Sequence, residues 1–381
     1  MTVKKGTSYN LIWRFRMLKS AFSPLFFFPE ASYNTPERRF IMKNKPKDIP
    51  YCGVREAKIG SLSVENVNAE ALNIFLHMVS ERYNIHLRKD IKQIDPPYTK
   101  DPILKNFRFT NVRREHDKET KWLIQHITSN NRLSYTDKLL NCILFRLFNK
   151  HETSELISMP IQFSKGYDPE HYRQLFAEAK SKDPNRKFFT GAFNTGGMKR
   201  ALKWYLPEDD PSNSMEMRVM HFMQYLIDEG ITQYLTSSEA DSPEAVCNLL
   251  QGYMGIGEFL AYQMFVDMTY IELFPFSENE YTIAGPGAKL GLKYLFSSKR
   301  DLTPEELIFW LRDHWNELNQ YNTHHGNKAT VYPKKLFRDL PEEDRVMNVM
   351  SIENCLCEFS KYYKVYHGLG RPRQKYKGGS R

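Results

Sequence analysis

The chain has 381 residues, of which 41% are hydrophobic, 26% charged and 14% aromatic. This composition excludes low-complexity disorder over most of the length and suffices for one large domain or two ordinary ones with a buried core. The net charge of +9 favours a polyanionic partner, nucleic acid before a membrane, although a solvated basic surface would give the same charge.

Residues 1–45 are basic; we expect a flexible extension, with a faint resemblance to an organellar transit peptide. Apolar residues then recur at helical spacing, which predicts one all-α domain over residues 46–368. The basic, glycine-rich residues 369–381 predict a mobile tail. The predicted helices cover residues 64–83, 118–127, 135–148, 169–179, 215–235, 244–253, 258–270 and 304–321.

Helix start signals precede several of these segments. Ser134 stands before one run, and Asp168, Ser242 and Thr303 each stand before a proline that can occupy the first helical position. We find no convincing alternating pattern for a strand.

The sequence carries no signal for disulfides, a membrane span, a zinc site or a nucleotide-binding phosphate loop. The five scattered cysteines and the absence of a secretory signal favour reduced thiols in a cytosol-like compartment. No apolar stretch reaches membrane-spanning length, so we expect no membrane partner. Neither cysteines nor histidines have the spacing of a zinc site, and no G-x-x-x-x-G-K-S/T phosphate loop is present. We therefore expect no metal and no cofactor.

The predicted helices near residues 246–270 are separated by Gly255-Ile256-Gly257. A tight turn between helices would explain these glycines. They would also suit a hairpin whose backbone lies against a DNA phosphate and whose second helix points free N–H groups outward.

A dense mixed-charge cluster occupies residues 108–121. A solvated helix start would explain its charges, but not the Pro-Pro-Tyr-Thr-Lys-Asp-Pro segment before it. The charged residues are Arg108, Arg113, Arg114, Glu115, Asp117, Lys118, Glu119 and Lys121.

These motifs resemble those of the α-glutamyl/putrescinyl thymine pyrophosphorylases, helical proteins of DNA base hypermodification. The family pattern P-P-W-T-x-D-P-I-L reads Pro96 to Leu104 here, with Tyr98 in place of Trp. The pattern R-F-C/T-N-V-x-R-E-x-D-R/K-x-T-R/K reads Arg108 to Lys121, with His116 where an acid is common. Further matches follow in the same order at residues 145–149, 255–263, 278–291, 357–362 and 370–373.

The resemblance implies a helix-hairpin-helix fold similar to that of DNA glycosylases. It also implies the activity of phage amino-acid:DNA transferases, or of the helical domain of a 5-hydroxymethyluracil DNA kinase. Such a transferase would expel phosphate or pyrophosphate from phosphorylated 5-hydroxymethyluracil in DNA and attach a small amine or amino acid. The thymine base would be flipped out of the duplex. The implied location is the host cytoplasm for a phage protein and the nucleus for a eukaryotic one.

This chemistry assigns roles to particular residues. A leaving phosphate needs cations, and an attacking amine, protonated at pH 7, needs a base. We expect Arg113, Arg114, Lys118 and Lys121 to hold phosphate, and Asn111 to read a pyrimidine edge. The candidate bases are Asp117, Glu278 and Glu280. The expected contacts to the DNA backbone are Gly255, Gly257, Gln263, Gly285 and Gly287.

Simpler roles stay open for these residues. Asp117 could pair with Arg113 or Lys121 across one helical turn, and Glu278 and Glu280 could be ordinary loop charges. We expect His116 to face solvent, Asp267 to cap a helix or face solvent, and Arg146 to be a structural ion-pair partner.

Two other functions also stay open. A DNA glycosylase would leave alkali-labile sites, and a non-catalytic DNA-binding module would leave the DNA unchanged. A transferase would add the mass of an amine to intact DNA.

Overall fold

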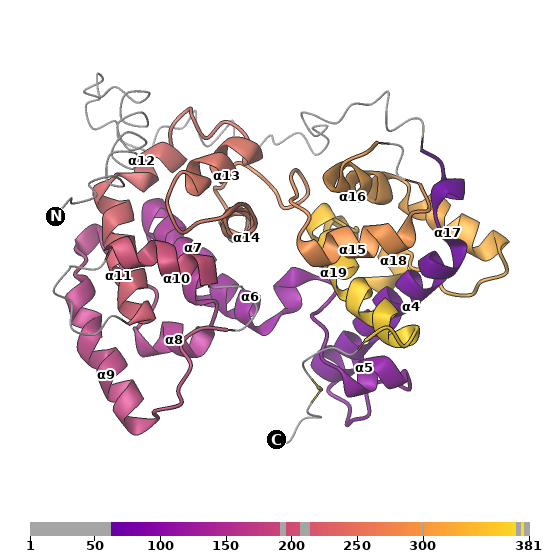
Figure 1. The fold of residues 1–381 in the computed structure, drawn as a ribbon, viewed down its shortest axis with the longest axis horizontal. Helices are drawn as coiled ribbons and strands as arrows, with labels where there is room; N and C mark the ends of the chain where they lie inside the picture. The colour runs from indigo at the N-terminus through magenta and orange to yellow at the C-terminus, as the bar shows by residue number, and fades with distance from the viewer. Residues whose placement is uncertain (1–61, 191–195, 206–213, 299–300, 371–374, 377–381) are drawn as a thin grey trace, which may run out of the picture. The chain divides into compact units, whose positions relative to one another are not determined.

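The computed structural model describes residues 62–190, 196–205, 214–298, 301–370 and 375–376. The expected N-terminal extension, residues 1–45, lies outside the described residues. The described part is built of helices, with isolated bridges but no strand, which confirms the all-α prediction (Figure 1).

The α-helices are α4 (Ala69–His86), α5 (Pro102–Asn106), α6 (Lys118–Leu123), α7 (Tyr135–Phe148), α8 (His151–Leu156), α9 (Arg173–Lys182), α10 (Gly196–Ala201), α11 (Met215–Asp228), α12 (Ile231–Leu235), α13 (Pro243–Gln251), α14 (Glu258–Thr269), α15 (Pro286–Leu295), α16 (Pro304–Asp313), α17 (Trp315–His324), α18 (Pro333–Leu336) and α19 (Val349–Tyr366). The short 3-10 or π turns are η1 (Val64–Asn66), η2 (Leu87–Ile91), η3 (Arg114–His116), η4 (Ile124–Thr128), η5 (Phe163–Lys165), η6 (Pro169–Tyr172), η7 (Leu202–Tyr205) and η8 (Glu342–Asp344).

The four predicted start signals all cap helical segments. Ser134, Asp168 and Ser242 each accept a hydrogen bond from a backbone N–H in the first turn that follows. Thr303 does the same at α16, where Glu306 reaches back to the Thr303 N–H. These side chains satisfy N–H groups that a helix start leaves without a partner.

Two predicted long helices are interrupted in the structure. Gly230, with a φ of +73°, separates α11 from α12, and His314 separates α16 from α17. Helices α15 and α19 were not predicted from the sequence, although α19 is as long as α4.

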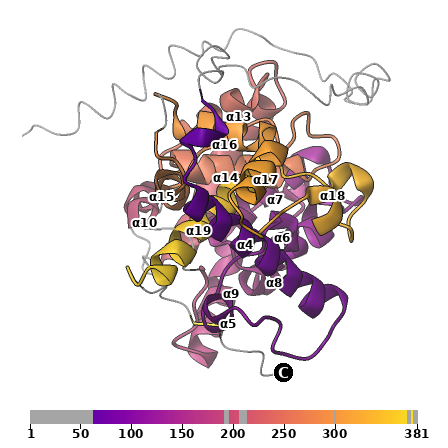
Figure 2. The same cartoon turned by 90° about the vertical axis from the view of Figure 1, so that its right-hand side faces the viewer.

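The buried apolar side chains form two clusters, and the residues of one cluster come mostly from the middle of the described chain. The first cluster draws on residues between Trp122 and Ile283, with Met350 added from α19. The second draws on Leu62 to Val112 and on Ala284 to Tyr362. Helices from the beginning and the end of the described chain therefore share one core, and α4 lies beside α19 (Figures 1 and 2).

Close contact between α15 and α19 depends on two glycines. A Cβ atom on Gly287 would lie 2.4 Å from Cys357 Sγ, and one on Gly291 would lie 2.3 Å from the Leu356 carbonyl oxygen. Only hydrogen fits at both positions, so these glycines let the two helices approach.

Hydrogen bonds of Asp101 give the Pro-Pro-Tyr-Thr-Lys-Asp-Pro segment a structural role. Asp101 Oδ1 accepts from the backbone N–H groups of Ile103 and Leu104 and so caps α5. Its Oδ2 accepts from the Tyr362 hydroxyl of α19 at 2.6 Å. The motif therefore joins a helix start to the second core.

Part of the expected mobile tail makes backbone contacts. The Tyr376 N–H donates to the Asn106 carbonyl at 2.9 Å, and Lys375 forms an isolated bridge with Phe107. The contact places the described tail residues beside the end of α5.

Candidate functional site

A buried carboxylate, Asp267 on α14, lies between two buried arginines. Arg146 of α7 donates to Asp267 Oδ2 from Nε at 2.7 Å and to Oδ1 at 2.5 Å. Arg114 of η3 donates to Asp267 Oδ1 at 3.1 Å. Asp267 has no exposed surface, so the expectation that it caps a helix or faces solvent is wrong. Arg146 is the ion-pair partner that the sequence predicted.

Arg113 and Arg114 point to different partners although they are adjacent. The Arg113 guanidinium donates from Nε to Glu115 Oε1 at 2.5 Å and to the Val346 carbonyl at 2.9 Å, and it lies over the Phe337 ring. Its side chain is 5% exposed, and that of Arg114 is 8% exposed. Both positive charges are therefore fixed inside the protein, which is the arrangement that stabilises charge developing on a bound group.

Glu278 lies beside these arginines. Tyr270, at the end of α14, donates to Glu278 Oε2 at 2.9 Å, and the Asn348 amide donates to Oε1. Burial and the neighbouring Glu115 carboxylate raise the pKa of Glu278 to about 7, against the opposing effect of Arg113. A carboxylate with this pKa can accept a proton near neutral pH.

Asp117 and Asn111 form a pair of their own. Asp117 Oδ1 accepts from the Asn111 backbone N–H at 2.9 Å and from its side-chain amide at 3.0 Å. Burial raises the pKa of Asp117, while the Asn111 bonds act against it. The expected ion pairs with Arg113 or Lys121 do not form in this structure, because Asp117 is the cap residue of α6 and faces Asn111.

The remaining charged candidates lie further out. Glu280 Oε1 accepts from the Ser277 backbone N–H at 2.9 Å and closes a turn. Lys118 has a side chain that is 72% exposed, with Glu152 at 3.5 Å. Lys121 is half-buried one turn further along α6. Lys118 is therefore exposed to solvent, whereas Glu280 has a local structural task.

The hairpin residues differ in their surroundings. Gly255 has a φ of +110°, and a Cβ there would lie 2.7 Å from Leu202 Cδ2, whereas a Cβ on Gly257 would meet nothing within 4 Å. Gln263 is 3% exposed and accepts a hydrogen bond from Arg114. The expectation that Gln263 contacts the DNA backbone is wrong for this structure, because its side chain is buried against Arg114.

Gly285 and Gly287 also have partners within the protein. The Gly285 N–H donates to Glu353 Oε1 of α19 at 3.0 Å, and Gly287 lies against Cys357. Burial raises the pKa of Glu353 to about 7, although the Gly285 hydrogen bond opposes this. Glu353, Tyr270 and Asn348 were not predicted from the sequence, because nothing in their local patterns marks them.

Several buried polar atoms near the arginines have no hydrogen-bond partner. Arg114 Nε and Gln263 Nε2 are donors of this kind, and Asn111 Oδ1 and Glu115 Oε2 are acceptors. Buried polar groups are normally paired, so their concentration here marks a place where a polar ligand or ordered water would be accommodated.

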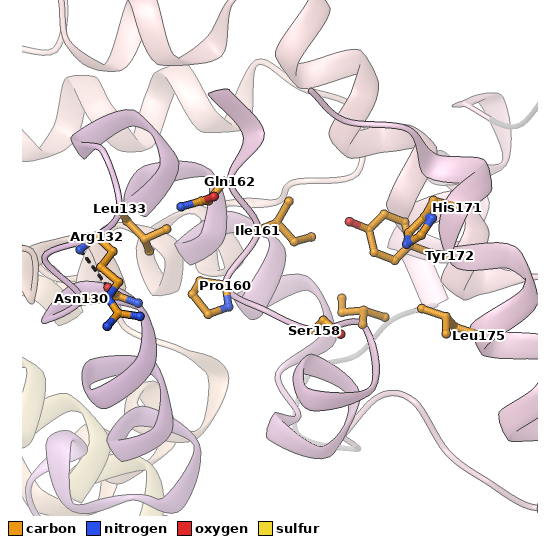
Figure 3. Close-up of a pocket in the computed structure, with 11 residues that line it drawn as sticks. Asn130, Arg132, Leu133, Ser158, Pro160, Ile161, Gln162, His171, Tyr172 and Leu175 are labelled. Atoms are coloured by element: carbon orange, nitrogen blue, oxygen red, sulfur yellow. Dashed lines mark hydrogen bonds between the residues drawn. The ribbon is translucent and has the colours of Figure 1, made fainter. Parts of the chain in front are cut away.

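A separate cavity of about 330 Å³ lies elsewhere, in the part of the chain that forms the first core. Its lining includes Arg132, Leu133, Ile161, His171 and Leu175 (Figure 3). None of the sequence-predicted site residues lines it, so it is not the place where the arginines and Glu278 meet.

The described structure defines an all-α protein with an acid of near-neutral pKa beside fixed arginines and an exposed basic helix start. In the described residues, no helix combines the length and apolar character that a membrane span requires.

The sequence model of a family described as the helical domain of 5-hmdU DNA kinase matches residues 69–370, and the chain belongs to this family. A protein of Bacillus phage SP10 named 5-hmdU DNA kinase is 26% identical over 308 residues, which cover 77% of this chain and 44% of that protein. The chain thus spans less than half the length of that relative. No solved structure matches the chain.

Proposed function

We propose that this chain is a transferase that acts on phosphorylated 5-hydroxymethyluracil in DNA and attaches a small amine or amino acid. Membership of the 5-hmdU DNA kinase helical-domain family supports a role in modifying this base. The chain has no G-x-x-x-x-G-K-S/T loop, so the proposal concerns a step after phosphorylation. The observation that carries it is Glu278, whose pKa is raised to about 7 beside Arg113 and Arg114.

In the proposed reaction, the Glu278 carboxylate removes one proton from the ammonium form of the amine. The freed nitrogen lone pair attacks the methylene carbon on C5 of the base. The carbon–oxygen bond then breaks, and its electron pair leaves with the phosphate or pyrophosphate. Arg113 and Arg114 stabilise the charge on the departing group, and the protonated Glu278 returns its proton to solvent.

The DNA must present this carbon outside the base stack. We propose that the α13–α14 hairpin contacts a backbone phosphate at Gly257, where an added Cβ would meet nothing within 4 Å. The same proposal places Lys118 on another phosphate, because most of its side chain is exposed. A helix-hairpin-helix arrangement like that of DNA glycosylases would give this geometry, and the hairpin between α13 and α14 supports it.

The test is nucleoside mass spectrometry of DNA that carries phosphorylated 5-hydroxymethyluracil, after incubation with the full chain and mixed amines. We expect intact DNA with the added mass of an amine. Glu278→Gln should lower the rate by on the order of 100-fold or more, because glutamine cannot accept the proton. Glu280→Gln is the matched control, since glutamine keeps the acceptor for the Ser277 N–H.

Three results would contradict the proposal or its assignment of Glu278. Alkali-labile sites without added mass would indicate a DNA glycosylase, and unchanged DNA with tight binding would indicate a binding module. Equal rates for Glu278→Gln and the wild-type chain would remove Glu278 from the reaction.

A further inference from the structure

His116 and His86 form a buried pair that the proposed reaction does not use. His86, the last residue of α4, is 2% exposed, and His116, in η3, is 9% exposed. Their rings are stacked with centroids 4.0 Å apart. The expectation that His116 faces solvent is therefore wrong.

Each of these histidines has a buried ring nitrogen without a hydrogen-bond partner. The atoms are His86 Nε2 and His116 Nδ1. Asp339, which lies between α18 and η8, brings a carboxylate to the same place, with Oδ2 3.8 Å from His86 Nε2. Ligand atoms of all three residues lie within 4.8 Å of one another.

Neighbouring side chains orient this group as they do around metal ligands. His86 Nδ1 bonds Asp90 Oδ2 at 2.8 Å, which leaves Nε2 directed toward the cluster. The Tyr83 hydroxyl donates to Asp339 Oδ1 at 2.7 Å, which leaves Oδ2 available. A carboxylate behind a histidine and a hydrogen bond to a ligating carboxylate are the usual supports of a metal site.

We propose that His86, His116 and Asp339 bind a divalent transition-metal ion of the Zn²⁺ type. Two imidazole nitrogens and one carboxylate oxygen match the donor preference of this ion and leave a fourth position for water. Alkaline-earth ions prefer oxygen ligands throughout and fit this set poorly.

Tetrahedral coordination at about 2.1 Å holds ligand atoms roughly 3.4 Å apart, so binding would draw the three side chains closer. The ion would join α4, η3 and the segment before η8, and would fix the turn that carries Arg114 and Glu115.

The other histidine–acid cluster provides a control. His151, Glu119 and Glu152 also bring ligand atoms together, but their histidine is already paired. His151 Nδ1 bonds Glu119 Oε1 at 3.1 Å, and His151 Nε2 lies 3.3 Å from Glu152 Oε1. His151→Gln should leave binding at the proposed site unchanged.

The experiment measures metal in the full chain by elemental analysis after purification without chelator. Chelator-treated protein is then titrated with Co²⁺, whose visible absorption reports four-coordinate nitrogen and oxygen ligands, and with Zn²⁺ by calorimetry. We expect one ion per chain, and a thermal unfolding midpoint that rises when Zn²⁺ is restored. His116→Gln should abolish the Co²⁺ bands.

Two conservative variants guard against a folding defect. Asp339→Asn keeps an acceptor for Tyr83 and should bind Zn²⁺ far more weakly, while its metal-free unfolding midpoint stays near that of the metal-free wild type. Asp90→Asn changes only the group behind His86 and should weaken Zn²⁺ affinity by about 10- to 100-fold. Asp90 is a positioning residue in this scheme.

The proposal would be overturned by a chain that neither carries an ion nor develops Co²⁺ bands. Unchanged affinity in both His116→Gln and Asp339→Asn would equally overturn it. So would loss of binding in His151→Gln alone, which would assign the ion to the Glu119 cluster. None of these results bears on amine transfer, so this inference fails separately from the proposed function.

Discussion

Arg114 donates a hydrogen bond to Asp267 at 3.1 Å across a separation of 153 residues. The contact joins η3 to α14. Turn η3 directly follows residues 62–112, which belong to the second core, whereas α14 belongs to the first core. Arg146 completes the arrangement from α7. The buried Asp267 carboxylate thus holds in place Arg114, which the proposed reaction uses. Both the stability of the fold and the geometry of the site therefore depend on Asp267.

Asp267→Asn should destabilise the protein strongly. The substitution removes the negative charge between two buried guanidinium groups, and an uncompensated buried charge costs about 3–5 kcal/mol. Urea unfolding followed by circular dichroism measures this change. Asp313→Asn is the control: Asp313 pairs with Arg312 at 2.7 Å but is 50% exposed, and exposed pairs contribute about 0–1 kcal/mol. Equal losses in the two variants would contradict the role of Asp267.

Glu353 should make the stability of the protein depend on pH. Its folded pKa of about 7 is higher than the usual glutamate value of 4.5, so the folded state binds more protons between these pH values. The free energy of unfolding should therefore be greatest below pH 4.5 for this group, and the contribution should be lost as pH rises through 7. Glu353→Gln should flatten the slope of unfolding free energy against pH over this window. An unchanged slope would show that Glu353 does not titrate there.

Lys118 should contribute to DNA affinity. Its side chain is 72% exposed and lies 3.5 Å from Glu152, while Lys334, in α18, is 79% exposed and lies 3.8 Å from Glu342. Lys118→Ala should weaken binding to any DNA sequence and reduce the slope of log affinity against log salt by about 0.9. Lys334→Ala, which alters a similar exposed pair, should change neither quantity. Fluorescence anisotropy over a salt series distinguishes the two.

Substitution by alanine should lower the stability of the protein at Gly291 but not at Gly257. A Cβ on Gly291 would lie 2.3 Å from the Leu356 carbonyl oxygen, so Gly291→Ala should force α15 away from α19 and cost about 1–3 kcal/mol. A Cβ on Gly257 would have open space, so Gly257→Ala should fold normally. Thermal unfolding compares them. Gly257→Val should then weaken DNA binding without unfolding the protein, and unimpaired binding would move the phosphate contact away from the hairpin.

The sequence predicted the helical elements best where local signals were strong. Ser134 precedes a helix with the predicted bounds, residues 135–148, because its hydroxyl caps the first turn and apolar residues repeat behind it. The break at Gly230 was missed because the apolar stripe continues across it. Gly287 was expected to contact the DNA backbone, whereas in the structure it lies against Cys357 of α19, a helix that was itself not predicted.

The candidate site was predicted in part, for a physical reason. Residues 111–118 are close in sequence, so their motif identified Arg113, Arg114 and Asp117 together. The two arginines have partners in distant segments: Arg114 donates to Asp267 and Gln263 of α14, and Arg113 donates to the Val346 carbonyl. Periodicity and spacing describe one element at a time, and they carry no information about which distant side chain will neutralise a buried charge.

The order of the two cores along the chain has a consequence for synthesis on the ribosome. The first core is drawn almost wholly from contiguous residues between Trp122 and Ile283, so it can assemble while the rest is being translated. The second core needs both α4 and α19. At ordinary translation rates, α19 is synthesised on the order of tens of seconds after α4. During that interval the apolar face of α4 has no permanent cover. The earliest described helix is therefore the one most exposed to chaperones and to aggregation before release.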